Sequence, residues 1–88
     1  DKEVNGINEM PKIKLYSTPT CIWCAKTREF FREHKIKYTD YDVSRNQKAA
    51  HEMIHKSGQM GVPVIEIDGK IIIGYNEEEL KKLLKVKR

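Results

Sequence analysis

Four short segments of the chain have the apolar patterns that are typical of β-strands. Lys12–Tyr16 alternates polar and apolar residues with a period of two, and Ile36–Val43 is rich in β-branched and aromatic residues. Two further apolar segments, Val62–Ile67 and Lys70–Gly74, flank the dipeptide Asp68–Gly69, which favours a tight turn between antiparallel strands. The pattern therefore predicts four strands, of which the last two form a hairpin.

Three other segments have the periodicity and the end signals of helices. The first helix is expected to run from about Cys21 to about His34. The second is expected to begin at a capping box, Ser44–Gln47, and to end at Gly58. Asn76 is expected to cap the third helix, which has glutamates in its first turn and basic residues toward residue 88, as the helix dipole favours. The apolar residues expected on the buried faces are Ala25, Phe30, Phe31 and His34, then Ala49, Ala50, Met53 and Ile54, and finally Leu80, Leu83 and Leu84.

The order of these elements is β-α-β-α-β-β-α, which predicts an α/β domain: a four-stranded mixed sheet flanked by helices. The first strand, helix and second strand form a βαβ unit, so these two strands are expected to be parallel. We expect a single domain over residues 10–88. Residues 1–9 show no period and are interpreted as a disordered or linker tail, or as a remnant preceding Met10.

Composition narrows the functional classes. The chain has 88 residues, of which 39% are hydrophobic, enough for one small core. No apolar run approaches the roughly 18–20 residues that span a bilayer, and no signal-peptide pattern opens the chain. The net charge of +4 comes from basic residues that alternate with glutamate on expected helix faces, without interleaved aromatic residues. These features predict a protein that binds neither nucleic acid nor membranes, and we expect it to be a cytoplasmic monomer.

Both cysteines lie in one C-x-x-C motif, Cys21–Cys24, where the first strand gives way to the first helix. On a helix, residues three apart share a face and are close enough for their sulfurs to bond. The free N–H groups and the dipole of a first helical turn favour a thiolate, which is the nucleophilic form of cysteine. We therefore expect Cys21 to be the attacking thiol and the more buried Cys24 to be the resolving thiol.

With these motifs, the chain resembles the glutaredoxins, a family with the thioredoxin-like fold, over about residues 10–84. The resemblance depends on the C-x-x-C motif after Tyr16–Thr20, on Gly61-Val62-Pro63, on the Asp68–Gly69 hairpin and on Gly74–Asn76 before the last helix. It implies a cis peptide bond between Val62 and Pro63, beside the dithiol, where Val62 offers its backbone to an extended substrate. Alternatively, this proline merely starts the third strand.

The resemblance also implies a set of residues that contact substrate or glutathione. Gln59 matches a position that contacts the glycine end of glutathione, and Gly74-Tyr75-Asn76 matches a loop that holds its γ-glutamyl end. Trp23 is interpreted as an exposed aromatic wall beside the sulfurs or as a residue packed on the sheet edge. The expected substrate-binding residues are Thr20, Trp23, Gln59, Val62, Pro63, Gly74, Tyr75 and Asn76.

Several positions depart from the family pattern. Tyr75 replaces a second glycine, Glu77 replaces an aspartate, and Thr18 stands where many glutathione-using members have a lysine. Ile22 replaces the proline that often follows the first cysteine. The glutamates after Asn76 also oppose binding of a carboxylate at the start of the last helix.

The predicted function is reduction of protein disulfides or glutathione-mixed disulfides, with glutathione as the co-substrate that recharges the dithiol. One alternative is a hydrogen donor that is recharged by thioredoxin reductase. A second is a module that binds an iron–sulfur cluster through Cys21 and glutathione between two subunits. A Cys₂His₂ zinc site with His51 and His55 is disfavoured, because a complete strand separates Cys24 from His51. We expect no metal.

Overall fold

The computed structural model describes residues 12–84, and the predicted tail at residues 1–9 and the basic residues at 85–88 lie outside this range. The predicted order of elements is confirmed. The elements are β1 (Ile13–Ser17), α1 (Ile22–Glu33), β2 (Thr39–Asp42), α2 (Gln47–Ser57), β3 (Val64–Ile67), β4 (Lys70–Ile73) and α3 (Glu77–Leu84). Within residues 12–84, no helix combines the length and apolar character needed to cross a membrane.

The four strands form one mixed sheet with the order β2-β1-β3-β4. β1 is parallel to β2, and it is antiparallel to β3, which is itself antiparallel to β4. The hairpin between β3 and β4 turns at Asp68 and Gly69, which have φ angles of 49° and 88°. Positive φ at both positions matches a type I′ turn, which explains why Asp-Gly occurs there.

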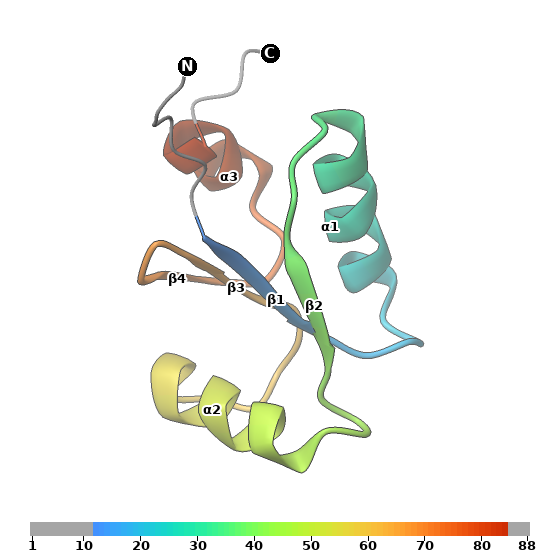
Figure 1. Ribbon diagram of the computed structural model, residues 1–88, viewed down its shortest axis with the longest axis vertical. Helices are drawn as coiled ribbons and strands as arrows, with labels where there is room; N and C mark the ends of the chain where they lie inside the picture. Colours follow the sequence, from blue (N-terminus) through green and yellow to red (C-terminus); the bar gives the residue numbers. More distant parts are fainter. Residues whose placement is uncertain (1–11, 85–88) are drawn as a thin grey trace.

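The helices cover both faces of the sheet (Figure 1). α1 and α3 lie on one face, where Leu15 and Ile65 from the sheet pack with Phe31 and Leu80 from the two helices. α2 lies on the other face, where Met53 packs against Tyr16 and Val64 in a smaller cluster. Alternate residues of β1 therefore enter opposite cores, with Leu15 on the α1 face and Tyr16 on the α2 face.

The structure corrects the predicted start of α2. The helix begins at Gln47, and its cap is Asn46, whose Oδ1 accepts a hydrogen bond from the Ala49 N–H at 3.0 Å. The capping box at Ser44 was therefore the wrong interpretation. Ser44 instead belongs to the preceding turn, where its N–H and hydroxyl both donate to Asp42 Oδ1.

Strand boundaries also differ from the prediction. β1 is displaced by one residue and includes Ser17, β2 comprises Thr39–Asp42 rather than Ile36–Val43, and β3 begins at Val64 rather than Val62. β2 is short because its pairing with β1 starts opposite Lys14. The residues before this point, Ile36 and Tyr38, pack on the α1 core without extending the ladder.

The buried face of α1 also differs in part. Phe30 and Phe31 are buried as predicted, but Ala25 is exposed, and Cys24 and Thr27 are fully buried in its place. Positions 24, 27 and 31 follow the three- and four-residue spacing of one helix face, and Ala25 lies beside this face. The position of Cys24 on it carries the second sulfur into the interior.

Candidate active site

Cys21 occupies the N-cap position of α1, between the loop that follows β1 and the first helical turn. Its Sγ accepts a hydrogen bond from the Cys24 N–H at 3.1 Å, as a capping oxygen does in other helices. The same sulfur lies 4.0 Å from the carbonyl oxygen of Val62. Cys21 is half-buried, so part of this residue is open to the surface.

Cys24 lies one turn further along α1 and is fully buried. Both cysteines are free thiols. Burial raises the pKa of the Cys24 thiol to about 12, and a hydrogen bond to Cys21 contributes to the increase. A backbone hydrogen bond from Thr18 and the charge of Arg28 act in the opposite direction. The two sulfurs are therefore unequal: one is reachable, and the other is held protonated in the interior.

The segment before β3 forms the second side of the site. The Val62–Pro63 peptide bond is cis, as the resemblance implied. Pro63 is fully buried, and its carbonyl oxygen accepts a hydrogen bond from the Gly74 N–H at 2.8 Å. This bond joins the proline segment to the loop that precedes α3, so the predicted residues Val62, Pro63 and Gly74 lie together near Cys21.

An aromatic pair forms the third side. Trp23 is 54% exposed and stacks on Tyr75, with ring centroids 6.2 Å apart, and Tyr75 also meets the edge of Phe30. The interpretation of Trp23 as packed on the sheet edge is therefore wrong. Burial raises the pKa of the Tyr75 phenol, and the carboxylates of Glu77, Glu33 and Glu29 raise it further. Tyr75 thus borders a small hollow of about 150 Å³ between α1 and α3, whose charged lining residues are three glutamates and Lys26.

Three predicted contact residues have local roles. The side-chain amide of Gln59 folds back on Gly61: its Oε1 accepts from the Gly61 N–H at 2.8 Å, and its Nε2 donates to the Gly61 carbonyl at 3.0 Å. Asn76 caps α3 by accepting a hydrogen bond from the Glu79 N–H at 3.1 Å. Thr20 is exposed at the tip of the loop before Cys21.

Some features of the site were missed by sequence reasoning. Ile22 and Met60 are exposed by 72% and 76%, and together with Trp23 they place apolar surface on the C-x-x-C turn and on the loop before Pro63. On the inner side, Arg28 bonds to Ser17 and Asp40 beside the buried thiol. The one available signal was the spacing of Arg28, four residues after Cys24, which puts it on the same helix face.

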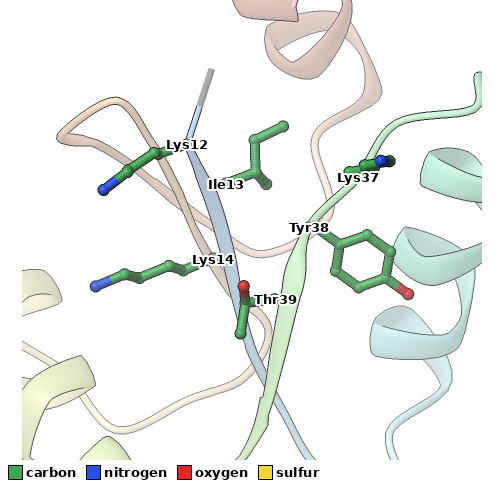
Figure 2. A pocket seen from close by; sticks show the side chains of 6 residues that line it. All are labelled: Lys12, Ile13, Lys14, Lys37, Tyr38 and Thr39. Carbon is green, nitrogen blue, oxygen red and sulfur yellow. The ribbon is translucent and has the colours of Figure 1, made fainter. Parts of the chain in front are cut away.

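His51 and His55 lie on the exposed side of α2, away from the cysteines. In residues 12–84, no group of three or more His, Cys, Asp and Glu side chains is arranged to hold a metal ion. A separate hollow of about 340 Å³ lies where β1 and β2 begin, lined by residues that include Lys12, Lys14 and Lys37 (Figure 2). It is at the opposite end of β1 from Cys21, so it is not part of the dithiol site.

The glutaredoxin family model matches residues 13–72, well over half of the chain. The chain belongs to the glutaredoxin family. An uncharacterized glutaredoxin-like protein of 8.6 kDa in the rubredoxin operon of Clostridium pasteurianum is 50% identical over 72 residues, which are 82% of this chain and 96% of that protein. Glutaredoxin 3 from Escherichia coli strain K12 is 26% identical, over 77% of this chain and 82% of its own.

The solved glutaredoxin from Archaeoglobus fulgidus has the same architecture, with a TM-score of 0.78 at 26% identity, over 93% of this chain and 100% of its own. The predicted thioredoxin-like fold of this glutaredoxin is therefore confirmed. Family membership, together with the C-x-x-C spacing, supports thiol redox chemistry as its function.

Proposed function

We propose that this glutaredoxin is a thiol–disulfide oxidoreductase in which Cys21 attacks and Cys24 resolves. In the first step, the Cys21 thiolate attacks a disulfide R–S–S–R′, forms Cys21–S–S–R and releases R′–S⁻. In the second step, the Cys24 sulfur attacks Cys21, closes an internal disulfide and releases R–S⁻. The two released thiolates carry the two electrons that the dithiol has lost, and a reductant then restores the dithiol.

The observation that carries this proposal is the different environment of the two sulfurs. Cys21 is reachable, and its sulfur already accepts a backbone N–H at 3.1 Å, the kind of contact that stabilises a negative charge. Cys24 is fully buried and is held in its protonated form by that burial. An external disulfide therefore meets Cys21 first, and Cys24 reacts only when a substrate sulfur is attached beside it.

The backbone at Val62 supports the assignment of a substrate-binding role to this segment. Its carbonyl faces the Cys21 sulfur at 4.0 Å, so a substrate chain bound covalently to Cys21 would lie alongside Val62. An extended peptide in this position pairs with exposed backbone groups as an added strand. The exposed side chains of Ile22, Trp23 and Met60 would then contact the residues that flank the substrate cysteine.

We further propose glutathione as the reductant, as in other glutaredoxins, with the protein acting as a monomer in the reducing cytoplasm. A protein reductase such as thioredoxin reductase is the second candidate, because three observations disfavour glutathione at the expected loop. Tyr75 stacks on Trp23 in the loop expected to hold the γ-glutamyl end, and Gln59 is bonded to its own loop. The three carboxylates around Tyr75, which outnumber the single cation of Lys26, also disfavour an anionic tripeptide.

Two single substitutions test the roles of the cysteines. Cys21→Ser is expected to lose at least 95% of disulfide reductase activity, because the hydroxyl is not ionised near neutral pH. Cys24→Ser is expected to form the mixed disulfide and stop there, so mass spectrometry of the protein after oxidised glutathione is added should show one attached glutathione. Retention of most activity by Cys21→Ser would contradict the assignment of roles.

The identity of the reductant requires a separate comparison. The oxidised protein is incubated with NADPH and either glutathione plus glutathione reductase or thioredoxin reductase alone, and NADPH consumption is followed with the same disulfide substrate. Faster turnover in the glutathione system supports glutathione as the reductant. Turnover with thioredoxin reductase alone, and little with glutathione, would establish the second candidate in its place.

A further inference from the structure

Three polar side chains form a closed network between α1 and the sheet, on the inner side of the dithiol. Arg28 donates from Nε to Asp40 Oδ2 at 2.7 Å and from Nη2 to Ser17 Oγ at 2.8 Å. Ser17 completes the triangle by donating its hydroxyl to Asp40 Oδ1 at 2.6 Å. Ser17 is fully buried at the end of β1, and Asp40 lies on the neighbouring strand β2. The guanidinium is therefore fixed on two sides.

Two observations place this network next to Cys24. Arg28 is four residues after Cys24 on α1, so both side chains lie on the helix face that meets the sheet. Ser17 is followed by Thr18, whose backbone lies near enough to the Cys24 sulfur to lower the pKa of that thiol. The titratable or charged groups acting on this sulfur are Cys21 and Arg28 from α1, while Asp40 on β2 and Tyr38 before it act on Arg28.

The resolving step requires a negative charge on the Cys24 sulfur. Cys24 must become a thiolate to attack, and burial strongly opposes this change. Once Cys21 carries a substrate sulfur, it no longer holds a negative charge that competes with Cys24. The positive charge of Arg28 then remains as the charged group that favours the Cys24 thiolate.

We propose that Arg28, held by Asp40 and Ser17, is a positioning residue for the resolving step, where its guanidinium stabilises the Cys24 thiolate. This inference rests on the proposed function. The step it assists is Cys24–SH plus Cys21–S–S–R giving the Cys21–Cys24 disulfide plus R–SH. One sulfur–sulfur bond forms and one breaks, the electron pair leaves on R–S⁻, and the proton lost by Cys24 ends on that leaving thiolate.

The two steps can be separated with one equivalent of 5,5′-dithiobis(2-nitrobenzoate) and the fully reduced protein. Attack by Cys21 releases the first coloured nitrothiobenzoate, and ring closure by Cys24 releases the second. Rapid-mixing absorbance therefore gives a rate for each step, and both rates are measured from pH 6 to pH 10 for the wild type, Arg28→Gln, Arg28→Lys and Asp40→Asn. Arg32→Gln is the matched control, since it removes the same charge from an exposed site one turn further along α1.

Arg28→Gln is expected to raise the pKa of the Cys24 thiol in the mixed disulfide by about one unit, since a partly exposed neighbouring charge acts on this scale. Thiolate then falls about tenfold at pH 7, while higher nucleophilicity restores about a factor of three, so ring closure slows about threefold. Because burial raises the pKa of the Cys24 thiol to about 12, this factor should stay nearly constant from pH 6 to pH 10. Arg28→Lys and Arg32→Gln are expected to stay within about twofold of the wild type, and Asp40→Asn should speed the second release because it removes a negative charge.

The proposal is overturned if Arg28→Lys or Asp40→Asn slows the second release as much as Arg28→Gln does, which is the result of a purely structural role. It is also overturned if Arg32→Gln matches Arg28→Gln. In both cases the wild type still releases two equivalents of nitrothiobenzoate, so the proposed function stands. Release of a single equivalent by the wild type would instead contradict ring closure itself, and with it the proposed function.

Discussion

Cys21 and Cys24 have the same side chain, but the start of α1 gives them different surroundings. The cap position leaves Cys21 half-buried and next to a backbone N–H, whereas the next turn carries Cys24 toward the sheet. A shift of one residue in the start of the helix would exchange buried and exposed positions on this face. The assignment of roles therefore depends on the cap at Cys21 as much as on the spacing of the motif.

The raised pKa of Cys24 predicts a loss of stability at high pH. A thiol whose pKa is higher in the folded than in the unfolded protein stabilises the fold below the unfolded pKa, and this contribution is lost as the pH rises toward the folded value. The window for the reduced protein therefore extends from about pH 9 toward about pH 12. The free energy of unfolding should fall by about 1 kcal/mol between pH 9 and pH 10 from this group.

Urea denaturation of the reduced protein at these two pH values measures the change, and Cys24→Ala is the control. This variant lacks the thiol but keeps the tyrosines and lysines that titrate in the same range, so its own pH dependence is subtracted. An equal loss of stability in both proteins would show that Cys24 does not contribute.

Gln59 shows why single contacts were harder to predict than positions. Its place four residues before Pro63 matched a family contact, and the structure does place it in the loop beside the site. However, its amide bonds both backbone groups of Gly61. A side chain with one donor and one acceptor group is satisfied by either arrangement, and sequence spacing does not distinguish them.

At the scale of elements, local signals predicted turns and ends that depend on one or two residues. Gly58 closes α2 with a left-handed φ of 76°, Asp68–Gly69 forms the hairpin, and Asn76 caps α3. The start of α2 was ambiguous because Ser44 and Asn46 are both good capping residues. Asn46 is the cap because Ser44 is bonded to Asp42 at the end of β2.

The cap of α2 leads to a direct comparison of two substitutions. Asn46→Ala removes the acceptor for the Ala49 N–H and should lower the free energy of unfolding by about 1 kcal/mol. That change corresponds to a melting temperature lower by about 4–8 °C for a domain of this size. Ser44→Ala should cost less, since it removes one exposed bond to Asp42 in the turn. Thermal unfolding by circular dichroism measures both, and a larger loss in Ser44→Ala would restore the capping-box interpretation.

Arrangements that join distant elements could not be predicted from the chain. The length of β2 depends on where its partner β1 begins to pair, and no pattern in residues 36–43 shows this point. The triangle of Ser17, Arg28 and Asp40 combines residues from two strands and a helix. Each of the three is an ordinary polar residue in its own segment, so only the packing of α1 on the sheet reveals the network.

At the scale of the whole molecule, a second polar network ties α2 to the opposite face of the sheet. Lys56 on α2 contacts Glu66 on β3 at 2.6 Å and Glu52 on its own helix at 2.9 Å, and Glu52 also contacts Lys14 on β1 at 3.5 Å. These partners raise the pKa of Lys56, Glu66 most of all, and Lys56 in turn holds the pKa of Glu52 below its ordinary value. The network lies over Tyr16, in the smaller of the two cores.

Lys56→Met should therefore loosen α2 while keeping most of the apolar stem. Glu66 is only 17% exposed, and without Lys56 its charge loses its nearest partner. We therefore expect the free energy of unfolding to fall by about 1–2 kcal/mol, between the values for surface and buried pairs.

The lowered pKa of Glu52 determines how this effect depends on pH. The ion pair of Glu52 with Lys56 stabilises the fold above about pH 4.5, and this stabilisation is lost as the pH falls below that value. Urea denaturation should show a gap between wild type and variant that is full at pH 7 and narrows below about pH 4.5. Lys48→Met, at an exposed position on the same helix, is the matched control, and an equal loss there would mean that the charge of Lys56 acts only through the net charge of the protein.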